Sequence, residues 1–392
     1  MTTTAGHREV IDRCEKMVAG LAERATEAEE LRRLPDATVQ AALDAELFSM
    51  VVPPSLGGLG LGLDTLAQST RILATGCPAS AWTLSFLVMH SWLLGRLDPE
   101  VHPELFEDRG YALAPAPLNP SGTARPVDGG FRLNGRWEWA TGVEHADWVL
   151  VHAIVDRPDE LATVFLAVPR SETTVEDVWF TSGMRATGSN AVSIADVFVP
   201  ANRTVSSTVV LERDGRFEGA LADDPMAGYP IIPVLALVAA APALGAAEAA
   251  VELFRRRLSE RVLAYTLGDK QADQPASRVR LATALAEVRS ARAVWEQALA
   301  ALTAAVEGGS PTTAERMDAR LAAASTVRIA RQAISTVCEG SGASIYAEGS
   351  PLQRLQRDVE VLKDHVIFDW DRCAELAGRI ALGQEPSPLD MV

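Results

Sequence analysis

The sequence predicts an α+β fold in which an N-terminal helical domain, a middle β-barrel or β-sandwich domain and a C-terminal four-helix bundle follow one another. Three observations lead to this prediction. Residues 1–110 repeat apolar side chains at helical spacing, residues 111–222 separate short β-branched and aromatic runs by Pro and Gly turns, and residues 223–392 form long helical stretches. The chain has 392 residues and is 48% hydrophobic, which is enough for cores in several domains.

The first domain is expected to consist of helices separated by Pro and Gly breaks, at about 6–34, 38–48, 64–76 and 79–95. The last of these helices carries Trp82 and His90, which are eight residues apart and so lie roughly on the same side. A lone histidine on an apolar helix is more often a core residue than a catalytic one, and both interpretations stay open at this point.

The middle domain is predicted from its turns and short apolar runs. Asp128-Gly129-Gly130 resembles a hairpin turn that leads into the strand F-R-L-N-G-R-W-E-W. Further strands are expected at Trp148–Val155, Thr163–Val168, Val175–Phe180 and Val192–Val199.

Four helices are expected in the third domain, at about 231–265, 275–306, 312–346 and 351–382, with Ser310 and Pro311 beginning the third of them. The first contains an uncharged stretch, Ile231–Ala247, which two prolines interrupt and a charged continuation follows. These features favour a buried bundle helix over a membrane span.

The last helix begins with a strong start signal. Ser350 suits the N-cap, Pro351 suits the first helical position, and Gln353 completes a capping box. Helical spacing is expected to place Asp358 and His365 on one flank, and the question is why a core helix should present an imidazole there.

The composition excludes several classes of function. The formal net charge of −16 argues against nucleic acid or an anionic membrane as the main partner. The four cysteines are widely scattered, so we expect reduced thiols in a cytoplasmic protein, with neither disulfides nor a metal site. The sequence contains no dinucleotide-binding G-x-G-x-x-G, no Walker loop and no G-x-S-x-G elbow.

The three-part order, together with V-P-P-S-L-G-G-L-G-L at 52–61, resembles the acyl-CoA dehydrogenase superfamily. Within it the chain is most similar to the two-component (group D) flavin-dependent monooxygenases, on the segments Pro120–Trp137, Ala140–Trp148, Ser182–Asn190 and P-L-Q-R-L-Q-R-D at 351–358 followed by D-H. The resemblance implies a tetramer with a flavin between the β-domain and the bundle.

One residue distinguishes the two branches of this superfamily. A dehydrogenase needs a carboxylate base, which family members place shortly after the R-D of the last helix or early in the bundle. The corresponding positions here are about His365–Val366 and the uncharged run Ile231–Ala247, and neither offers a Glu. An imidazole instead suits oxygen chemistry, because it can donate to a flavin C4a-hydroperoxide or take a proton from a phenol or indole.

By resemblance, His365 is expected to have one of these two catalytic roles, and His90 is a further catalytic candidate. His90, Trp82 and Trp139 are expected to line the substrate cavity. Thr141 is expected to contact flavin N5, although relatives often have two Ser at 140–141 where this chain has Ala-Thr.

Donors to the flavin are expected from three places, each of which is also an ordinary turn or helix surface. They are the strand end with Trp139, Thr141 and Gly142, the loop with Arg185, Thr187, Gly188 and Ser189, and the bundle residue Arg261. Gly340, Ser341, Gly342 and Arg354 are expected to reach the flavin of a neighbouring subunit.

We therefore predict the oxygenase component of a two-component monooxygenase that hydroxylates a phenol, an indole or a polycyclic aromatic. Reduced FAD or FMN and O₂ are the expected cofactors, and an NAD(P)H-dependent flavin reductase is the expected transient partner of a homotetramer. The alternatives are an N-oxygenase of an amine or amino-sugar nucleotide, an acyl-CoA dehydrogenase and a flavin-free scaffold.

Overall fold

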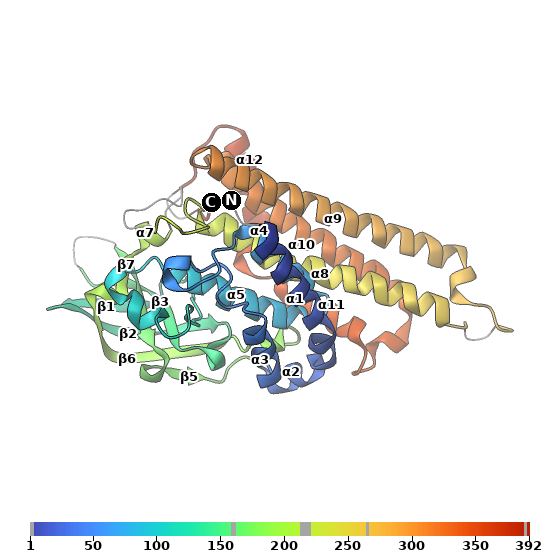
Figure 1. Ribbon diagram of the computed structural model, residues 1–392. Helices are drawn as coiled ribbons and strands as arrows, with labels where there is room; N and C mark the ends of the chain where they lie inside the picture. The colour runs from blue at the N-terminus through green and yellow to red at the C-terminus, as the bar shows by residue number, and fades with distance from the viewer. Residues whose placement is uncertain (1–3, 158–161, 212–220, 264–265, 388–389) are drawn as a thin grey trace.

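The structure is a computed structural model that describes residues 4–157, 162–211, 221–263, 266–387 and 390–392. Helices from the N-terminal part lie between a β-sheet on one side and a bundle of long helices on the other (Figure 1). The order of these parts along the chain is the predicted one.

The N-terminal part contains six α-helices among the described residues, at α1 (Thr4–Glu23), α2 (Ala25–Leu31), α3 (Asp36–Asp44), α4 (Leu63–Ala74), α5 (Pro78–Leu94) and α6 (His102–Phe106). The predicted helix 6–34 is thus broken at Arg24 into α1 and α2. Every residue of α5 is buried, because α5 packs against α4, against the bundle helices α8 and α11, and against the short 3₁₀ turn Arg185–Thr187 of the β-domain. This helix therefore links the three parts of the molecule.

The described part of the β-domain forms one sheet. Its strands are β1 (Gly122–Val127), β2 (Gly130–Ala140), β3 (Trp148–Val155), β4 (Thr163–Pro169), β5 (Thr174–Glu176), β6 (Asn190–Pro200) and β7 (Thr204–Ser206). Their order is β5-β6-β2-β1-β3-β4-β7, and all neighbours are antiparallel except β1 and β3. The predicted strand Val175–Phe180 is wrong beyond Glu176, where the chain leaves the sheet.

The sheet curls around a core of its own. Side chains of β1, β2, β3, β4 and β6 meet in one cluster, and β4 contacts β6 although the two are not neighbours in the sheet. Trp137 is fully buried in this core, where its indole N–H donates to the His152 carbonyl at 2.7 Å. The result is a partly closed barrel with a separate hydrophobic core.

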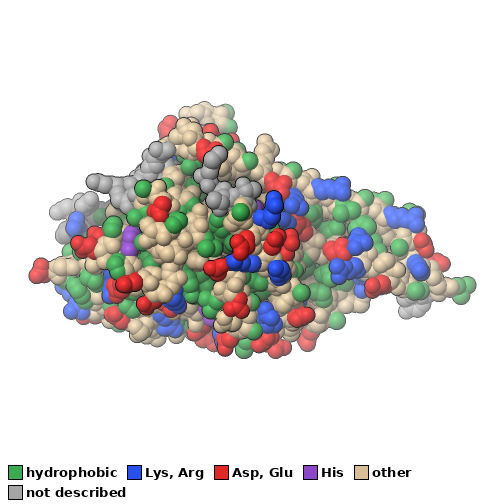
Figure 2. All heavy atoms as spheres, viewed as in Figure 1, with side chains coloured by type: hydrophobic (Ala, Val, Ile, Leu, Met, Phe, Trp, Pro, Cys, Tyr) green, Lys and Arg blue, Asp and Glu red, His purple; other side chains and the backbone are tan. Residues whose placement is uncertain are grey.

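The bundle has three long helices, α8 (Ile231–Glu260), α9 (Pro275–Gly308) and α10 (Thr313–Ser341), followed by the shorter α11 (Pro351–Leu362) and α12 (Trp370–Ala381). Among the described residues α8 is the one helix long and apolar enough to cross a membrane, but 89% of its apolar window is buried in the protein. It packs against α4, α5, α9 and α10, so it is a core helix. Figure 2 shows acidic and basic side chains interspersed over one face of the molecule.

The single last helix predicted over 351–382 is wrong. Helix α11 ends at Leu362, a short 3₁₀ turn, η9 (Val366–Phe368), follows, and Asp369 caps α12 by accepting from the Arg372 N–H. His365 therefore does not lie on a helix flank. It has an extended backbone, with φ −63° and ψ 134°, at the N-cap of η9.

Two predicted helix caps are also wrong. Ser350 makes no side-chain cap bond, and the Gln353 amide donates instead to the Glu348 carbonyl at 2.8 Å. Helix α10 is capped by Thr312 and not by Ser310. The Thr312 hydroxyl accepts from the Glu315 N–H, and the Glu315 carboxylate accepts from the Thr312 N–H.

Two substitutions at the start of α10, one at the cap and one two residues before it, test the assignment of the cap. Thr312→Ala is expected to lower the free energy of unfolding by about 1 kcal/mol, because an orphan helix N–H loses its partner. Ser310→Ala, two residues earlier, is expected to change it by less than about 0.5 kcal/mol. Denaturant unfolding of both variants measures the difference, and equal effects would contradict the assignment of the cap.

Candidate active site

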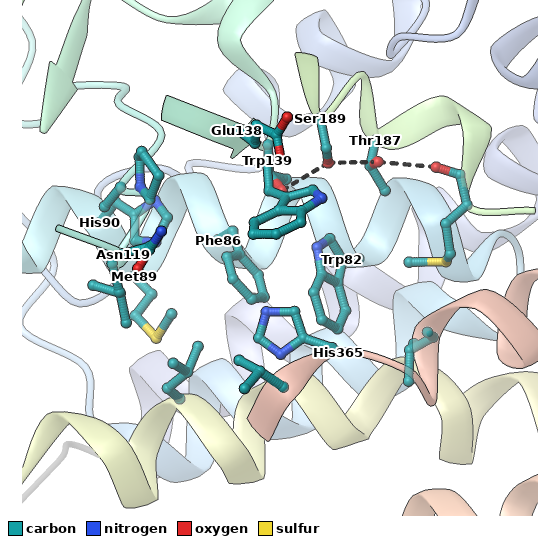
Figure 3. Close-up of a pocket in the computed structure, with 18 of the residues that line it drawn as sticks. Trp82, Phe86, Met89, His90, Asn119, Glu138, Trp139, Thr187, Ser189 and His365 are labelled. Atoms are coloured by element: carbon teal, nitrogen blue, oxygen red, sulfur yellow. Dashed lines mark hydrogen bonds between the residues drawn. The ribbon is translucent and has the colours of Figure 1, made fainter. Parts of the chain in front are cut away.

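A cavity of about 360 Å³ lies where the three parts of the chain meet. Helix α5 forms one wall, the end of β2 and the loop before β6 form a second, and α8 with the end of α11 closes it (Figure 3). Most of its lining is apolar, and its described members are Trp82, Phe86, Met89, His90, Leu93, Ala116, Pro117, Leu118, Asn119, Glu138, Trp139, Thr141, Trp179, Met184, Thr187, Ser189, Ile231, Leu235, Val361, Leu362, Asp364, His365, Val366 and Met391.

Aromatic rings from α5 and His365 form the floor of the cavity. Trp82 and Phe86 stack with their centroids 4.5 Å apart, and His365 meets Trp82 edge-on at 5.3 Å. His90 meets Phe86 edge-on at 5.4 Å. Trp82, Phe86 and His90 are four residues apart in turn, so one face of α5 presents all three to the cavity.

Hydrogen bonds assign opposite tautomers to the two histidines. Nδ1 of His90 lies 2.9 Å from the Ala114 carbonyl, which can only accept, so Nδ1 carries the proton and Nε2 is a bare acceptor. Nδ1 of His365 accepts the Ile367 N–H at 3.3 Å, so its proton is on Nε2. Among the described residues neither Nε2 has a hydrogen-bond partner.

Both imidazoles are neutral at physiological pH. Burial lowers the pKa of His365 to about 4, and burial likewise lowers the pKa of His90 to about 4, although its bond to Ala114 acts in the other direction. The two imidazoles therefore present one neutral donor, at His365 Nε2, and one neutral acceptor, at His90 Nε2, to the cavity.

A β-bulge turns Trp139 into the cavity. In a regular strand Trp137 and Trp139 would point to the same face, but the pairing of β2 with β6 shifts register between Trp137 and Ala140. Trp139 has a φ of 62°, which is rare for a large side chain, and the residue is 61% exposed whereas Trp137 is buried. Strained backbone of this kind concentrates at functional sites.

Three buried hydroxyl groups form a chain beside Trp139. Thr141 Oγ1 lies 2.9 Å from Ser189 Oγ, which lies 2.8 Å from Thr187 Oγ1. Thr187 in turn donates to the Met184 carbonyl at 2.9 Å, and the dashed lines of Figure 3 trace this chain. It connects the cavity to the loop between β5 and β6.

Helix α11 holds that loop in place. The buried carboxylate of Asp358 accepts the Met184 N–H at 2.6 Å, and Arg357 donates to the Ser182 carbonyl and pairs with Glu29. Between them Gly183 packs so closely that a Cβ there would lie 2.1 Å from the Arg357 carbonyl oxygen. Burial raises the pKa of Asp358 to about 7.

Seven of the predicted site residues line the cavity: Trp82, His90, Trp139, Thr141, Thr187, Ser189 and His365. Four others lie close to these segments but outside the lining. Gly142 packs against Thr83, the Arg185 guanidinium donates to the Glu29 carbonyl, Gly188 packs against Arg32, and the buried Arg354 donates to Thr26.

The remaining four predicted residues gather elsewhere. Arg261 follows the last residue of α8 and, like Arg257, donates to the Ser341 carbonyl, between Gly340 and Gly342. Leu235 of the cavity is 26 residues away on the same helix, which corresponds to roughly 40 Å. Arg261 is therefore far from a flavin in the cavity of its own chain, and its contact with a flavin stays a prediction.

Three polar lining residues were not predicted as site residues: Asn119, Glu138 and Asp364, the last of which directly precedes His365. Asn119 lies in a Pro-rich connection without a motif, and only its position in space identifies it. Glu138 stands between the two tryptophans that were noted, and strand alternation alone would have placed it on the face opposite to theirs.

A helical domain, a curled β-domain and a helical bundle that enclose a cavity at their junction define an enzyme of the acyl-CoA dehydrogenase fold. The family model "Acyl-CoA dehydrogenase, C-terminal domain" matches residues 237–370. The chain is 30% identical over 386 residues to the oxygenase subunit HsaA of a flavin-dependent monooxygenase from Mycobacterium tuberculosis, covering 96% of each protein. It is 28% identical to the oxygenase component of p-hydroxyphenylacetate 3-hydroxylase from Acinetobacter baumannii, covering 97% of this chain and 90% of the relative.

Among solved structures, XiaF from Streptomyces sp. in complex with FADH₂ and glycerol superposes with a TM-score of 0.91 at 29% identity, covering 97% of this chain and 96% of that one. This chain belongs to the oxygenase components of two-component flavin-dependent monooxygenases. The predicted family, fold and reduced-flavin monooxygenase activity are confirmed, and so is a separate reductase as the source of reduced FAD or FMN. The alternatives of a dehydrogenase and of a flavin-free scaffold are set aside.

The rim of the cavity fits a flavin ring system. The exposed indole of Trp139 offers an apolar face to a planar ring, and the adjacent Thr141 hydroxyl offers a hydrogen bond. Deeper inside, the rings of Trp82, Phe86 and the two histidines leave an apolar space for a substrate.

Proposed function

We propose that this enzyme hydroxylates a small aromatic compound that carries a ring hydroxyl or a ring N–H, such as a phenol, an indole or a polycyclic relative of either. The observation that carries the proposal is the pair of neutral histidines with opposite tautomers in an aromatic-lined cavity. The name of the similar p-hydroxyphenylacetate 3-hydroxylase, a phenol hydroxylase, supports this class of substrate.

His90 is the proposed contact of the ring hydroxyl or N–H. Its bare Nε2 accepts that proton in a hydrogen bond, which increases the electron density of the ring carbons that are to be oxygenated. Since the pKa of His90 is about 4, the imidazole favours a shared proton over complete transfer.

His365 is the proposed donor to the reacting oxygen. Its Nε2–H lies in a cavity where burial keeps the ring neutral, and a preorganised donor in a water-excluded site stabilises charge that develops on oxygen. When bound, reduced flavin supplies the activation of O₂. The side chains orient the substrate, exclude water and provide these two hydrogen bonds.

Trp82 and Phe86 position the aromatic ring of the substrate in this proposal. Their stacked rings extend from His365 to His90, so a planar ring lying on them is within reach of both imidazoles. The N-oxygenation of an amino-sugar nucleotide is the less favoured alternative, because the described residues that line the cavity include no Lys or Arg to bind a diphosphate.

We propose that the protein is a homotetramer in which a distal cluster of each subunit contacts the flavin of a neighbouring subunit. This cluster consists of Arg257, Arg261 and the turn Gly340–Gly342. Two guanidinium groups converge there on one carbonyl, and cations of this kind suit a phosphate. The apolar side chains of Val262 and Tyr346 beside it are more than half exposed, which is consistent with a covered surface. Four buried free thiols support a cytoplasmic location.

A substrate screen with a flavin reductase tests the proposal. With NAD(P)H and FAD or FMN supplied, we expect hydroxylated product from phenols or indoles and none from amino-sugar nucleotides, with product and H₂O₂ measured for each compound. N-oxygenated product from an amine alone would overturn the assignment. Light scattering of the purified protein measures the tetramer, and Arg261→Ala is expected to weaken flavin binding only if the tetramer forms.

A further inference from the structure

The chain of hydroxyl groups beside Trp139 has a fixed direction. The Met184 carbonyl can only accept, so the single proton of the Thr187 hydroxyl points toward it at 2.9 Å. Thr187 Oγ1 must then accept from Ser189, and Ser189 Oγ must accept from Thr141. This order uses the proton of Thr141 inside the protein and leaves only lone pairs on its oxygen for the cavity.

The opposite direction is unfavourable for two reasons. It would leave Thr187 Oγ1 and the Met184 carbonyl oxygen facing each other at 2.9 Å without a proton between them. The three hydroxyl-bearing residues are each at least 93% buried, so water does not relieve such a contact.

The Met184 carbonyl, at which the row of hydroxyl groups ends, is held rigidly. Met184 has a φ of 52°, an uncommon conformation for a residue with a side chain, and its N–H is bound by the buried Asp358. Its carbonyl also accepts the Trp179 indole N–H at 3.0 Å. The carbonyl that orients the hydroxyl groups is therefore held from both sides.

We propose that Thr187 and Ser189 are positioning residues that hold Thr141 as a hydrogen-bond acceptor, so that the site favours a flavin protonated at N5 over an oxidised one. This inference rests on the proposed function, which places flavin N5 at Thr141. Reduced flavin carries a proton on N5 and donates it, whereas N5 of oxidised flavin has a lone pair that would face the lone pairs of Thr141. An oxygenase that receives reduced flavin and must release the oxidised form benefits from this difference.

Binding measurements on hydroxyl variants test the inference. We measure Kd for oxidised flavin by titration and Kd for reduced flavin anaerobically, and we compare the ratio of the two. In Ser189→Ala and Thr187→Val the hydroxyl of Thr141 is free to rotate and donate, so oxidised flavin is expected to bind more tightly and the preference for reduced flavin to fall about tenfold. Ser189→Thr and Thr187→Ser keep a hydroxyl and are expected to keep the preference.

Ser193→Ala is the matched control. Ser193 lies four residues after Ser189, on β6, and its hydroxyl donates to Glu176 outside the cavity. It is expected to leave the ratio unchanged. An unchanged ratio in folded Ser189→Ala and Thr187→Val, or equal affinity of the wild-type protein for both flavins, overturns the inference and leaves the proposed substrate chemistry intact. A wild-type protein that binds neither form contradicts the proposed function itself.

Discussion

His365→Ala is expected to lower the rate of product formation by about 10²-fold or more, with most of the consumed O₂ recovered as H₂O₂. The alanine removes the one neutral N–H donor that the imidazoles present to the cavity, while the proposed flavin contacts at Trp139 and Thr141 stay in place. Flavin binding is therefore expected to persist. The measurement is product and H₂O₂ formed per NAD(P)H consumed, together with Kd for reduced flavin.

A second variant separates catalysis from local folding. Nδ1 of His365 accepts the Ile367 N–H at the start of η9, and the side-chain oxygen of His365→Asn can accept the same bond. Asn is too short to place a donor where Nε2 lies, so His365→Asn is expected to fold like the wild type and to form H₂O₂ like His365→Ala. Wild-type yields of product in both variants would show that His365 has only a structural role.

The regular elements of the fold could be predicted from local patterns, because helices and strands repeat their buried side chains with a fixed period. The same rule predicts the part of the site that lies on one helix face, as with Trp82 and His90 on α5, although Phe86 between them was not predicted as a site residue. It fails at His365. The apolar period runs on through Val366, but Val366 is 44% exposed and the buried residues are Ile367 and Phe368, because the helix has already ended.

The polar half of the site could not be predicted from local patterns. Thr141 and Ser189 are 48 residues apart, and Asp358 and Met184 are 174 apart, so only the packing of the three parts joins them. The Arg261 cluster shows the converse. The resemblance assigned Arg261 and Gly340–Gly342 to different flavin contacts, but the Arg261 guanidinium donates to the Ser341 carbonyl, and the length of α8 places both far from the cavity of their own chain.

Asp358 is expected to make the stability of the protein depend on pH in an unusual direction. An unfolded Asp has a pKa of about 3.9, whereas burial raises the pKa of Asp358 to about 7 in the folded state. Between these values the folded protein holds a proton that the unfolded chain has lost. The contribution of Asp358 to the free energy of unfolding therefore falls as pH rises from about 4 to about 7, by a total of a few kcal/mol.

Asp358→Asn isolates this effect, because asparagine has no charge and keeps a side-chain oxygen for the Met184 N–H. The difference in unfolding free energy between the variant and the wild type is the quantity to measure at each pH. The contributions of His90 and His365 cancel in this difference, because both proteins contain them. Their lowered pKa values make each protein less stable as pH falls from about 6.5 to about 4. We expect the free energy of unfolding of Asp358→Asn to increase steadily relative to that of the wild type between pH 5 and about pH 7.

Asp358 is also expected to hold in place the loop that contains Met184, Thr187 and Ser189. Asp358→Ala leaves the buried Met184 N–H without a partner, which is expected to cost about 1–3 kcal/mol at every pH. It also frees the Met184 carbonyl to move, so the preference for reduced flavin is expected to fall in Asp358→Ala and to persist in Asp358→Asn. If the difference between Asp358→Asn and the wild type does not vary with pH, the nearby Arg354 and Arg357 outweigh burial and the carboxylate is charged throughout.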